Sequence, residues 1–145
     1  MKKNVLILSV MFLLAVYAQA ATFTFNGSGD WSNTANWFGG TLPGPTDDVV
    51  IANMFPSASA TLDMDVTVNS ITIGGMGAGE LIINGHTLNI GSGGLTIGDG
   101  GFGPGSLDGT AGGTININGG DLTVNSNGNF NGANSPLTEI GRAHV

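Results

Sequence analysis

Two pairs of carboxylates are the side chains in this sequence whose spacing could support catalysis. Asp63 and Asp65 lie two residues apart, and Asp47-Asp48 could add a third group. On an extended strand, Asp63 and Asp65 would share one face with their Cα atoms ~6.6 Å apart. This is near the carboxyl spacing of enzymes that hydrolyse glycosidic bonds with inversion. A general acid needs an apolar pocket that raises its pKa, whereas these acids fall between short apolar segments. We therefore expect a solvated corner and no catalytic residue.

A metal site is the second chemical possibility. Asp99 and Asp108 lie in a glycine-rich segment, residues 98–113, and carboxylate oxygens suit Ca²⁺. The segment departs from the G-G-x-G-x-D register of calcium-binding nonapeptides, which favours a mobile loop. His86 has no cysteine with which to complete a zinc site, and the other histidine lies in a tail interpreted below as non-native. We predict no cofactor, with a calcium-stabilised spacer as an alternative.

Two tryptophans, Trp31 and Trp37, are the candidate ligand-binding residues. Aromatic faces stack on sugar rings, so the pair could form a sugar platform. Large aromatic side chains serve mostly as buried hydrophobic area, however. We expect both tryptophans to belong to a hydrophobic cap.

The charge distribution excludes whole classes of partner. The 145 residues contain ten Asp and Glu but three Lys and Arg, and no Lys or Arg lies between residues 21 and 138. Nucleic-acid binding requires basic residues that neutralise phosphates, so we exclude it, together with recognition of acidic polymers by ion pairing. No Ser/His/Asp arrangement and no phosphate-binding loop is present, and we expect no enzymatic activity in this chain.

The first 20 residues predict a secretory signal peptide. Lys2 and Lys3 precede an apolar core at residues 5–16, and Ala18-Gln19-Ala20 forms an A-x-A cleavage site. The apolar core is too short to span a membrane comfortably. We expect the mature chain to start at Ala21, to be secreted or displayed on the outer cell surface, and to have no membrane span.

Residues 132–145 are expected to form a C-terminal tail. Its last seven residues, EIGRAHV at 139–145, resemble the translation of a widely used sequencing adapter. We interpret them as non-native and exclude them from the fold. The chain would then be the N-terminal part of a longer protein.

Between these ends, short triplets of the form apolar–x–apolar recur. They begin at residues 49, 61, 66, 71, 81, 88, 95, 115 and 122. Val49, Ile71 and Leu95 are 22 and 24 residues apart, and three short strands per turn of about 22 residues is typical of a β-solenoid. The sequence therefore predicts an all-β fold, a parallel β-helix (solenoid) of about three coils of three short strands, at residues 47–131.

The triplets also predict which side chains stack. Side chains alternate between the two faces of a strand, so the outer residues of each triplet should point inward. The expected interior columns are Val49–Ile71–Leu95, Ile51–Ile73–Ile97, Leu81–Ile115, Ile83–Ile117, Val66–Leu88–Leu122 and Val68–Ile90–Val124. The expected outward ladders are Val50–Thr72–Thr96, Ile82–Asn116 and Thr67–Asn89–Thr123. In this register, segment 98–113 contains about ten extra residues.

Residues 21–46 are expected to cap the first coil. An open solenoid end exposes unpaired strand edges, and terminal repeats are atypical. The segment ATFTF alternates like a strand, and Trp31, Trp37 and Phe38 supply apolar area. We therefore predict an N-terminal aromatic cap.

The run from Gly29 to Ile51, W-S-x-x-x-N-W-x-G-G-x-x-P followed by D-D-V-V-I, resembles the start of many bacterial secreted β-helix proteins. These include autotransporter-like passenger repeats and pectin-lyase-like extracellular β-helices. The segments LPGPTDDVVI, ATLDMDVTVNSITIGG and GHTLNIGSGGLTIG are also similar to an extracellular β-helical domain defined by eight recurring glycines. The resemblance implies a secreted or surface role, adhesion, and contact with extracellular polysaccharide or a host or cell surface.

These observations favour a secreted or cell-surface structural or adhesive β-helix fragment. The alternative is a non-catalytic N-terminal portion of a carbohydrate-active β-helix enzyme. A third hypothesis, ice binding through outward Thr ladders, requires a long, flat array, which Val50, Asn89 and Asn116 interrupt.

Overall fold

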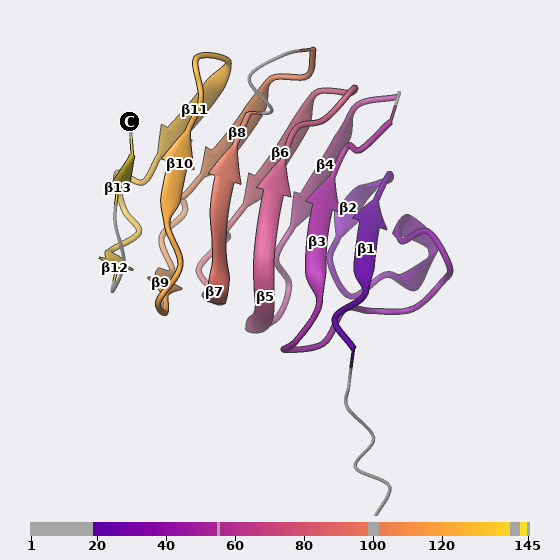
Figure 1. The fold of residues 1–145 in the computed structure, drawn as a ribbon, viewed down its shortest axis with the longest axis horizontal. Coiled ribbons are helices and arrows are strands. Elements are labelled where there is room, and N and C mark those ends of the chain that lie inside the picture. Colours follow the sequence, from indigo (N-terminus) through magenta and orange to yellow (C-terminus); the bar gives the residue numbers. More distant parts are fainter. Residues whose placement is uncertain (1–18, 55, 99–101, 140–142, 145) are drawn as a thin grey trace, which may run out of the picture.

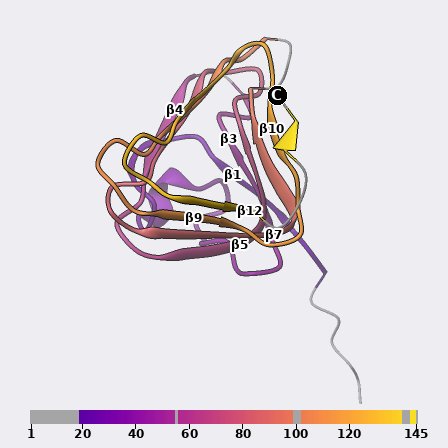
Figure 2. The ribbon, with the colours of Figure 1, turned by 90° about the vertical axis from the view of Figure 1, so that its left-hand side faces the viewer.

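The computed structural model describes residues 19–54, 56–98, 102–139 and 143–144. These residues wind into parallel coils around one core (Figure 1) with a three-sided cross-section (Figure 2). In the described part of the chain, the elements are β1 (Thr22–Phe25), β2 (Ser28–Asp30), the 3-10 helix η1 (Thr34–Asn36), β3 (Asp48–Ile51), β4 (Ala58–Thr61), β5 (Val66–Ile73), β6 (Gly79–Ile82), β7 (Thr87–Ile97), β8 (Gly105–Asp108), β9 (Thr114–Ile117), β10 (Leu122–Val124), β11 (Gly128–Asn131), β12 (Leu137–Glu139) and β13 (Ala143–His144).

A turn of the chain contributes one strand to each of three faces, except that the first turn, from β1 to β3, has no described strand on face 3. Face 1 contains β1, β3, the second halves of β5 and β7, β10 and β13. Face 2 contains β2, β4, β6, β8 and β11, and face 3 contains the first halves of β5 and β7 with β9 and β12. Strands β5 and β7 serve two faces because their pairing register shifts between Val68 and Ser70. The fold is a parallel β-solenoid, as the triplet pattern predicts.

The number of coils was underestimated. Face 2 is a five-stranded sheet with one strand per turn, so the solenoid has about five turns and not three. The additional turns come from the two ends. Strands β1 and β2, within the expected cap at 21–46, pair in register with β3 and β4. Strands β12 and β13, within the expected tail at 132–145, pair with β9 and β10. The adapter interpretation of residues 139–145 stays a prediction.

The first half of the expected core is confirmed. Val49 pairs with Ile71 and Ile71 with Leu95, while Ile51, Ile73 and Ile97 form the adjacent column. All six side chains are buried. On face 3, Val66 pairs with Leu88 and Val68 with Ile90, also as expected. Each fully buried aliphatic side chain stabilises the fold by roughly 1.5–3 kcal/mol, so the columns bind the coils together.

The expected register of the later coils is wrong. Leu122 pairs with Leu95 and not with Leu88, which pairs with Ile115. Leu81 lies between Ala60 and Leu107, away from Ile115. The expected pairings of Ile83 with Ile117 and of Ile90 with Val124 are also wrong. In the structure, Ile117 pairs with Ile90, and Val124 pairs with Ile97.

The cause is segment 98–113, where the sequence predicts extra loop residues. It contains β8, which pairs with β6 on one side and β11 on the other. The turn is therefore complete but long: Asn116 follows its ladder partner Asn89 by 27 residues, whereas Asn89 follows Thr67 by 22.

The outward ladders also differ from the expected register in the later coils. The ladder of Val50, Thr72 and Thr96 is confirmed, and it extends to Thr24 and Thr123. The ladder that starts with Thr67 and Asn89 continues to Asn116 and Thr138, not to Thr123. Ile82 pairs with Thr61 and Asp108 and not with Asn116.

The N-terminal edge of face 1 is covered by the segment that follows η1. This segment runs antiparallel to β1, with a bridge between Phe25 and Trp37. The amide of Phe38 donates to the carbonyl of Thr24 (2.9 Å), and the amide of Asn26 donates to the carbonyl of Asn36 (3.0 Å). Covering an edge strand removes free backbone groups that would otherwise pair with another chain. The aromatic segment thus caps the first coil.

Candidate functional site

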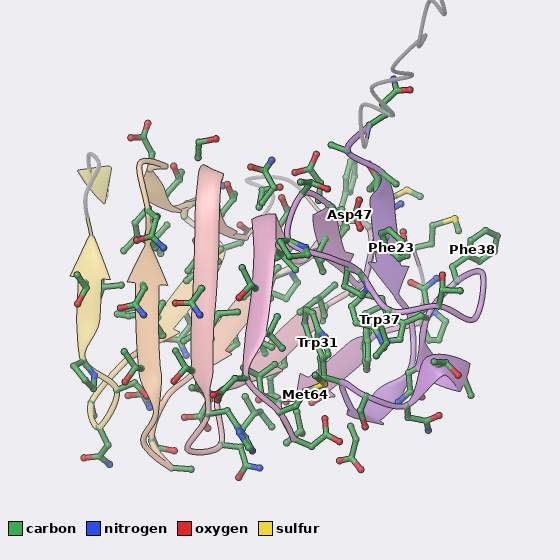
Figure 3. The ribbon with its side chains drawn as sticks, turned by 90° about the horizontal axis from the view of Figure 1, so that it is seen from below. Phe23, Trp31, Trp37, Phe38, Asp47 and Met64 are labelled. Carbon is green, nitrogen blue, oxygen red and sulfur yellow. The ribbon has the colours of Figure 1, made fainter. Side chains whose placement is uncertain are left out.

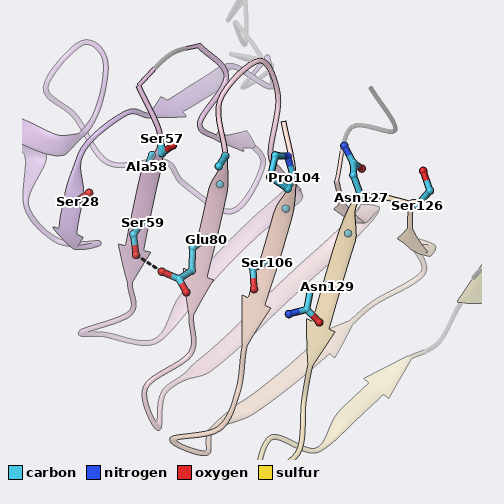
Figure 4. Close-up of a pocket in the computed structure, with 14 residues that line it drawn as sticks. Ser28, Ser57, Ala58, Ser59, Glu80, Pro104, Ser106, Ser126, Asn127 and Asn129 are labelled. Atoms are coloured by element: carbon cyan, nitrogen blue, oxygen red, sulfur yellow. Dashed lines mark hydrogen bonds between the residues drawn. The ribbon is translucent and has the colours of Figure 1, made fainter. Parts of the chain in front are cut away.

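A groove of about 560 Å³ lies across face 2. Residues of β2, β4, β6, β8 and β11 line it (Figure 4). Its floor is a row of polar side chains that pair in register from one turn to the next. The row, which we call the polar row, consists of Ser28, Ser59, Glu80, Ser106 and Asn129. Neighbouring members are about 4.8 Å apart, the spacing of adjacent strands.

The corner before face 2 is built from small residues. Gly79, Gly105 and Gly128 occupy the first position of β6, β8 and β11 and stack in register. A Cβ on Gly105 would lie 2.1 Å from the carbonyl oxygen of Ile73, and one on Gly128 would lie 2.2 Å from that of Ile97. Each face-2 strand therefore starts against the backbone at the end of a face-1 strand. Ser57, Pro104 and Asn127 directly precede β4, β8 and β11 and also line the groove (Figure 4).

Among the described residues that line the groove, Glu80 is the only one with an ionisable side chain. Its Oε2 accepts a hydrogen bond of 2.7 Å from the Ser59 hydroxyl (Figure 4), and both side chains are half-buried. The remaining polar lining consists of serine hydroxyls and asparagine amides. Such a surface donates and accepts hydrogen bonds along its whole length but carries one negative charge.

Asp63 and Asp65 are not arranged as a catalytic pair. Asp63 accepts hydrogen bonds from the hydroxyl and the amide of Ser32, and these hold the pKa of Asp63 below its usual value. Asp65 accepts from the amide of Thr87 (2.8 Å), and its Oδ1 lies 3.6 Å from Nδ1 of His86. Both carboxylates are exposed. A general acid requires a raised pKa, whereas that of Asp63 is lowered.

Asp47 and Asp48 also make contacts between turns. Oδ1 of Asp47 accepts from the amide of Ala21 (3.0 Å), and Oδ2 accepts from that of Gly44 (2.8 Å). Oδ1 of Asp48 accepts from the side-chain Nδ2 of Asn69 (2.8 Å) and from the hydroxyl of Ser70 (2.6 Å). Neither carboxylate lines the groove.

Of the two calcium candidates, Asp99 lies outside the described residues. Asp108 is the last residue of β8, and its Oδ1 accepts from the amide of Thr110 (2.8 Å). Hydrogen bonds from Thr110 lower the pKa of Asp108. Within the described ranges, no three His, Cys, Asp or Glu side chains come close enough together to hold a metal ion.

Trp31 and Trp37 lie inside the N-terminal cap, whereas Phe38 points away from it (Figure 3). Their side chains are 2% and 3% exposed. The two rings meet edge to face with centroids 4.7 Å apart, and Phe25 packs against both. A sugar stacks on an exposed aromatic face, and in this arrangement neither indole offers one.

The polar row was not recognised in the sequence as a group of binding residues. The strands that carry it read ASAT, GELI, GSLD and GNFN. They share a small residue, then a polar residue, then in three of the four a large apolar residue. This pattern lacks the apolar–x–apolar form that defined the triplets. A search for small–polar–apolar repeats would have placed β8 in one series with β6 and β11, but the line of polar side chains appears only once the strands are in register.

Comparisons of the chain with protein-family models, with curated proteins and with solved structures give no match. The class of the protein is therefore set by its own geometry: a parallel β-solenoid of about five turns with a polar groove on one face. No helix in the described part of the chain is long and apolar enough to cross a membrane.

Proposed function

We propose that the chain is an exported structural solenoid that binds a neutral, hydroxyl-rich polysaccharide in the groove on face 2. The observation that carries the proposal is the polar row. Five polar side chains at the spacing of adjacent strands line one continuous groove. An extended sugar polymer presents hydroxyl groups at regular intervals, and each can donate and accept hydrogen bonds with Ser, Asn and Glu side chains.

The charge of the chain indicates which kind of polymer the groove can bind. No Lys or Arg lies between residues 21 and 138, whereas nine acids do. A polyanion would be repelled by this field. Among the described lining residues, a polycation would find a single carboxylate, that of Glu80. A neutral polymer that pairs through hydroxyl groups suits the lining best.

The hydrogen bonds that the acidic side chains accept support a role as a scaffold. Asp48, Asp63 and Asp65 accept hydrogen bonds from residues 21 to 31 positions away in the sequence. Within one outward ladder, the side-chain amide of Asn116 donates to Oδ1 of Asn89 (2.9 Å). Ionisable and amide groups that could act in chemistry instead join adjacent turns. A stack joined in this way presents its groove as a fixed surface.

The binding proposal is tested by pull-down on insoluble neutral polysaccharides, cellulose and chitin, with an acidic polysaccharide as the comparison. Ser106→Trp fills the centre of the groove and should abolish binding. Thr96→Trp is the matched control, because Thr96 is a half-buried outward residue on face 1. It should bind like the unmodified chain.

Three results would contradict the proposal: no retention on either neutral polymer, equal binding by the two variants, or preference for the acidic polymer. Light scattering shows whether Ser106→Trp instead alters self-association, which would identify a second copy of the chain as the occupant.

Export is tested separately by expressing the whole chain in a bacterial host with and without residues 1–20. We expect the leader to direct the chain out of the cytoplasm, with an N-terminus at Ala21 by mass spectrometry. Retention of the complete chain inside the cell would contradict export and leave the binding result intact.

A further inference from the structure

Ala21 is held from both sides at the point where the fold starts. Its amide nitrogen lies 3.0 Å from Oδ1 of Asp47, and its carbonyl oxygen accepts from the amide of Asp48 at 2.8 Å. The preceding residues, Gln19 and Ala20, are exposed and belong to no strand. Strand β1 begins directly afterwards, at Thr22. The predicted cleavage point, between Ala20 and Ala21, is therefore the boundary between free chain and solenoid.

The carboxylate of Asp47 is positioned for this contact by its own turn. Its Oδ2 accepts a 2.8 Å hydrogen bond from the amide of Gly44, within the loop before β3. This leaves Oδ1 directed at the nitrogen of Ala21. Asp47 is half-buried, and Figure 3 shows it beside the start of the chain's first strand. The acceptor is thus in place whatever the chemical state of the nitrogen.

We propose that removal of the leader converts this hydrogen bond into an ion pair between the α-ammonium group of Ala21 and Asp47, which fastens the first strand to the solenoid. The proposal rests on the exported part of the proposed function. Hydrolysis of the Ala20–Ala21 peptide bond consumes one water molecule. It leaves a carboxylate on Ala20, which departs with the leader, and an amino group on Ala21. An α-amino group has a pKa of roughly 8 and is protonated at neutral pH.

The charge balance of the chain makes this cation distinctive. Between residues 21 and 138, the chain has nine acids and no Lys or Arg. The other carboxylate next to the contact, Asp48, accepts from Asn69 and Ser70 on the following turn. The Ala21 ammonium would therefore be the only fixed positive charge at this end of an acidic solenoid, and Asp47 is its nearest acceptor among the described contacts.

The test uses the processed chain, residues 21–145, with the N-terminus either free or acetylated. Acetylation keeps an N–H donor on Ala21 and removes the charge. In the chain with Asp47, we expect acetylation to lower the Tm by roughly 2–4 °C at low salt, the size of a surface ion pair in a domain of this length. In Asp47→Asn, acetylation should leave the Tm unchanged.

An equal effect of acetylation in both chains, or no effect in either, would overturn the proposal. If Asp47→Asn fails to fold, the salt dependence of the unsubstituted chain decides: an ion pair requires the difference to shrink in 1 M NaCl, and a constant difference overturns the proposal. The test is independent of export and polysaccharide binding. A chain that keeps its leader in cells would defeat export, while the ion pair would still be measurable in the recombinant protein.

Discussion

The indole Nε1 of Trp37 donates a buried hydrogen bond of 2.7 Å to the carbonyl oxygen of Trp31. The two rings also pack edge to face, at an interplanar angle of 76°. This contact closes the loop that contains η1 and lies over Phe25, the last residue of β1. One side chain therefore satisfies a buried carbonyl, fills the open end of the core and covers the edge of face 1.

Trp37→Phe should destabilise the chain strongly, because it removes the donor and leaves the Trp31 carbonyl buried beside a small cavity. We expect the free energy of unfolding to fall by about 2–4 kcal/mol, measured by urea denaturation. The matched control is Phe38→Leu: this neighbouring side chain is 76% exposed and should tolerate the change within ~0.5 kcal/mol. Similar losses in the two variants would show that the cap does not stabilise the solenoid.

The corner before face 2, where glycines stack from turn to turn, should also be destabilised by the addition of a single methyl group. Gly105→Ala places a Cβ 2.1 Å from the carbonyl oxygen of Ile73, so the backbone must move, and we expect a loss of about 1–3 kcal/mol. In the control, Gly44→Ala, the nearest atom to the new Cβ is Oδ2 of Asp47 at 3.4 Å, an ordinary contact. Thermal unfolding of the two variants measures the difference. Equal melting temperatures would show that the corner has room for a side chain.

The sequence was sufficient for the fold class because aliphatic side chains at a constant interval have few ways to be buried. Val49, Ile71 and Leu95 are separated by nearly equal lengths of chain, and the structure stacks them. The turn that contains β8 breaks this regularity, and counting triplets assigned Leu122 to the wrong neighbour. The register between neighbouring strands depends on the length of each loop, and the spacing of the triplets does not give that length.

The groove could not be predicted for a different reason. Its polar row is contributed by one residue from each of five turns, and Ser28, Glu80 and Asn129 share neither residue type nor a motif. Only the correct register brings them into one line. By contrast, the cap was predictable, because Trp31 and Trp37 concentrate apolar area where an exposed core end requires it.

The contact between Ser32 and Asp63 predicts a loss of stability in acid. Hydrogen bonds from the hydroxyl and amide of Ser32 lower the pKa of Asp63 from 3.8. The ionised form is favoured in the folded chain, so its contribution is complete above pH 3.8 and disappears as the pH falls through the lowered value. Asp63→Asn should therefore reduce the dependence of unfolding free energy on pH between 2 and about 5, and Ser32→Ala should do so in part. Urea denaturation at several pH values measures it, and an unchanged slope in Asp63→Asn would contradict the assignment.

The register of the long turn can be tested with engineered disulfides, because the chain has no cysteine. Thr96 and Thr123 are register partners on neighbouring strands, at a Cα separation of about 5 Å that a disulfide can bridge. The double variant Thr96→Cys/Thr123→Cys should therefore oxidise readily and completely. Asn89→Cys/Thr123→Cys represents the register inferred from the triplets, but in the structure Asn89 pairs with Asn116. It should remain reduced under the same mild oxidation. Mass spectrometry of the unreduced proteins distinguishes the two states. If the second pair closes and the first stays open, β8 does not form part of the coil, and the groove, which depends on the same register, would be lost with it.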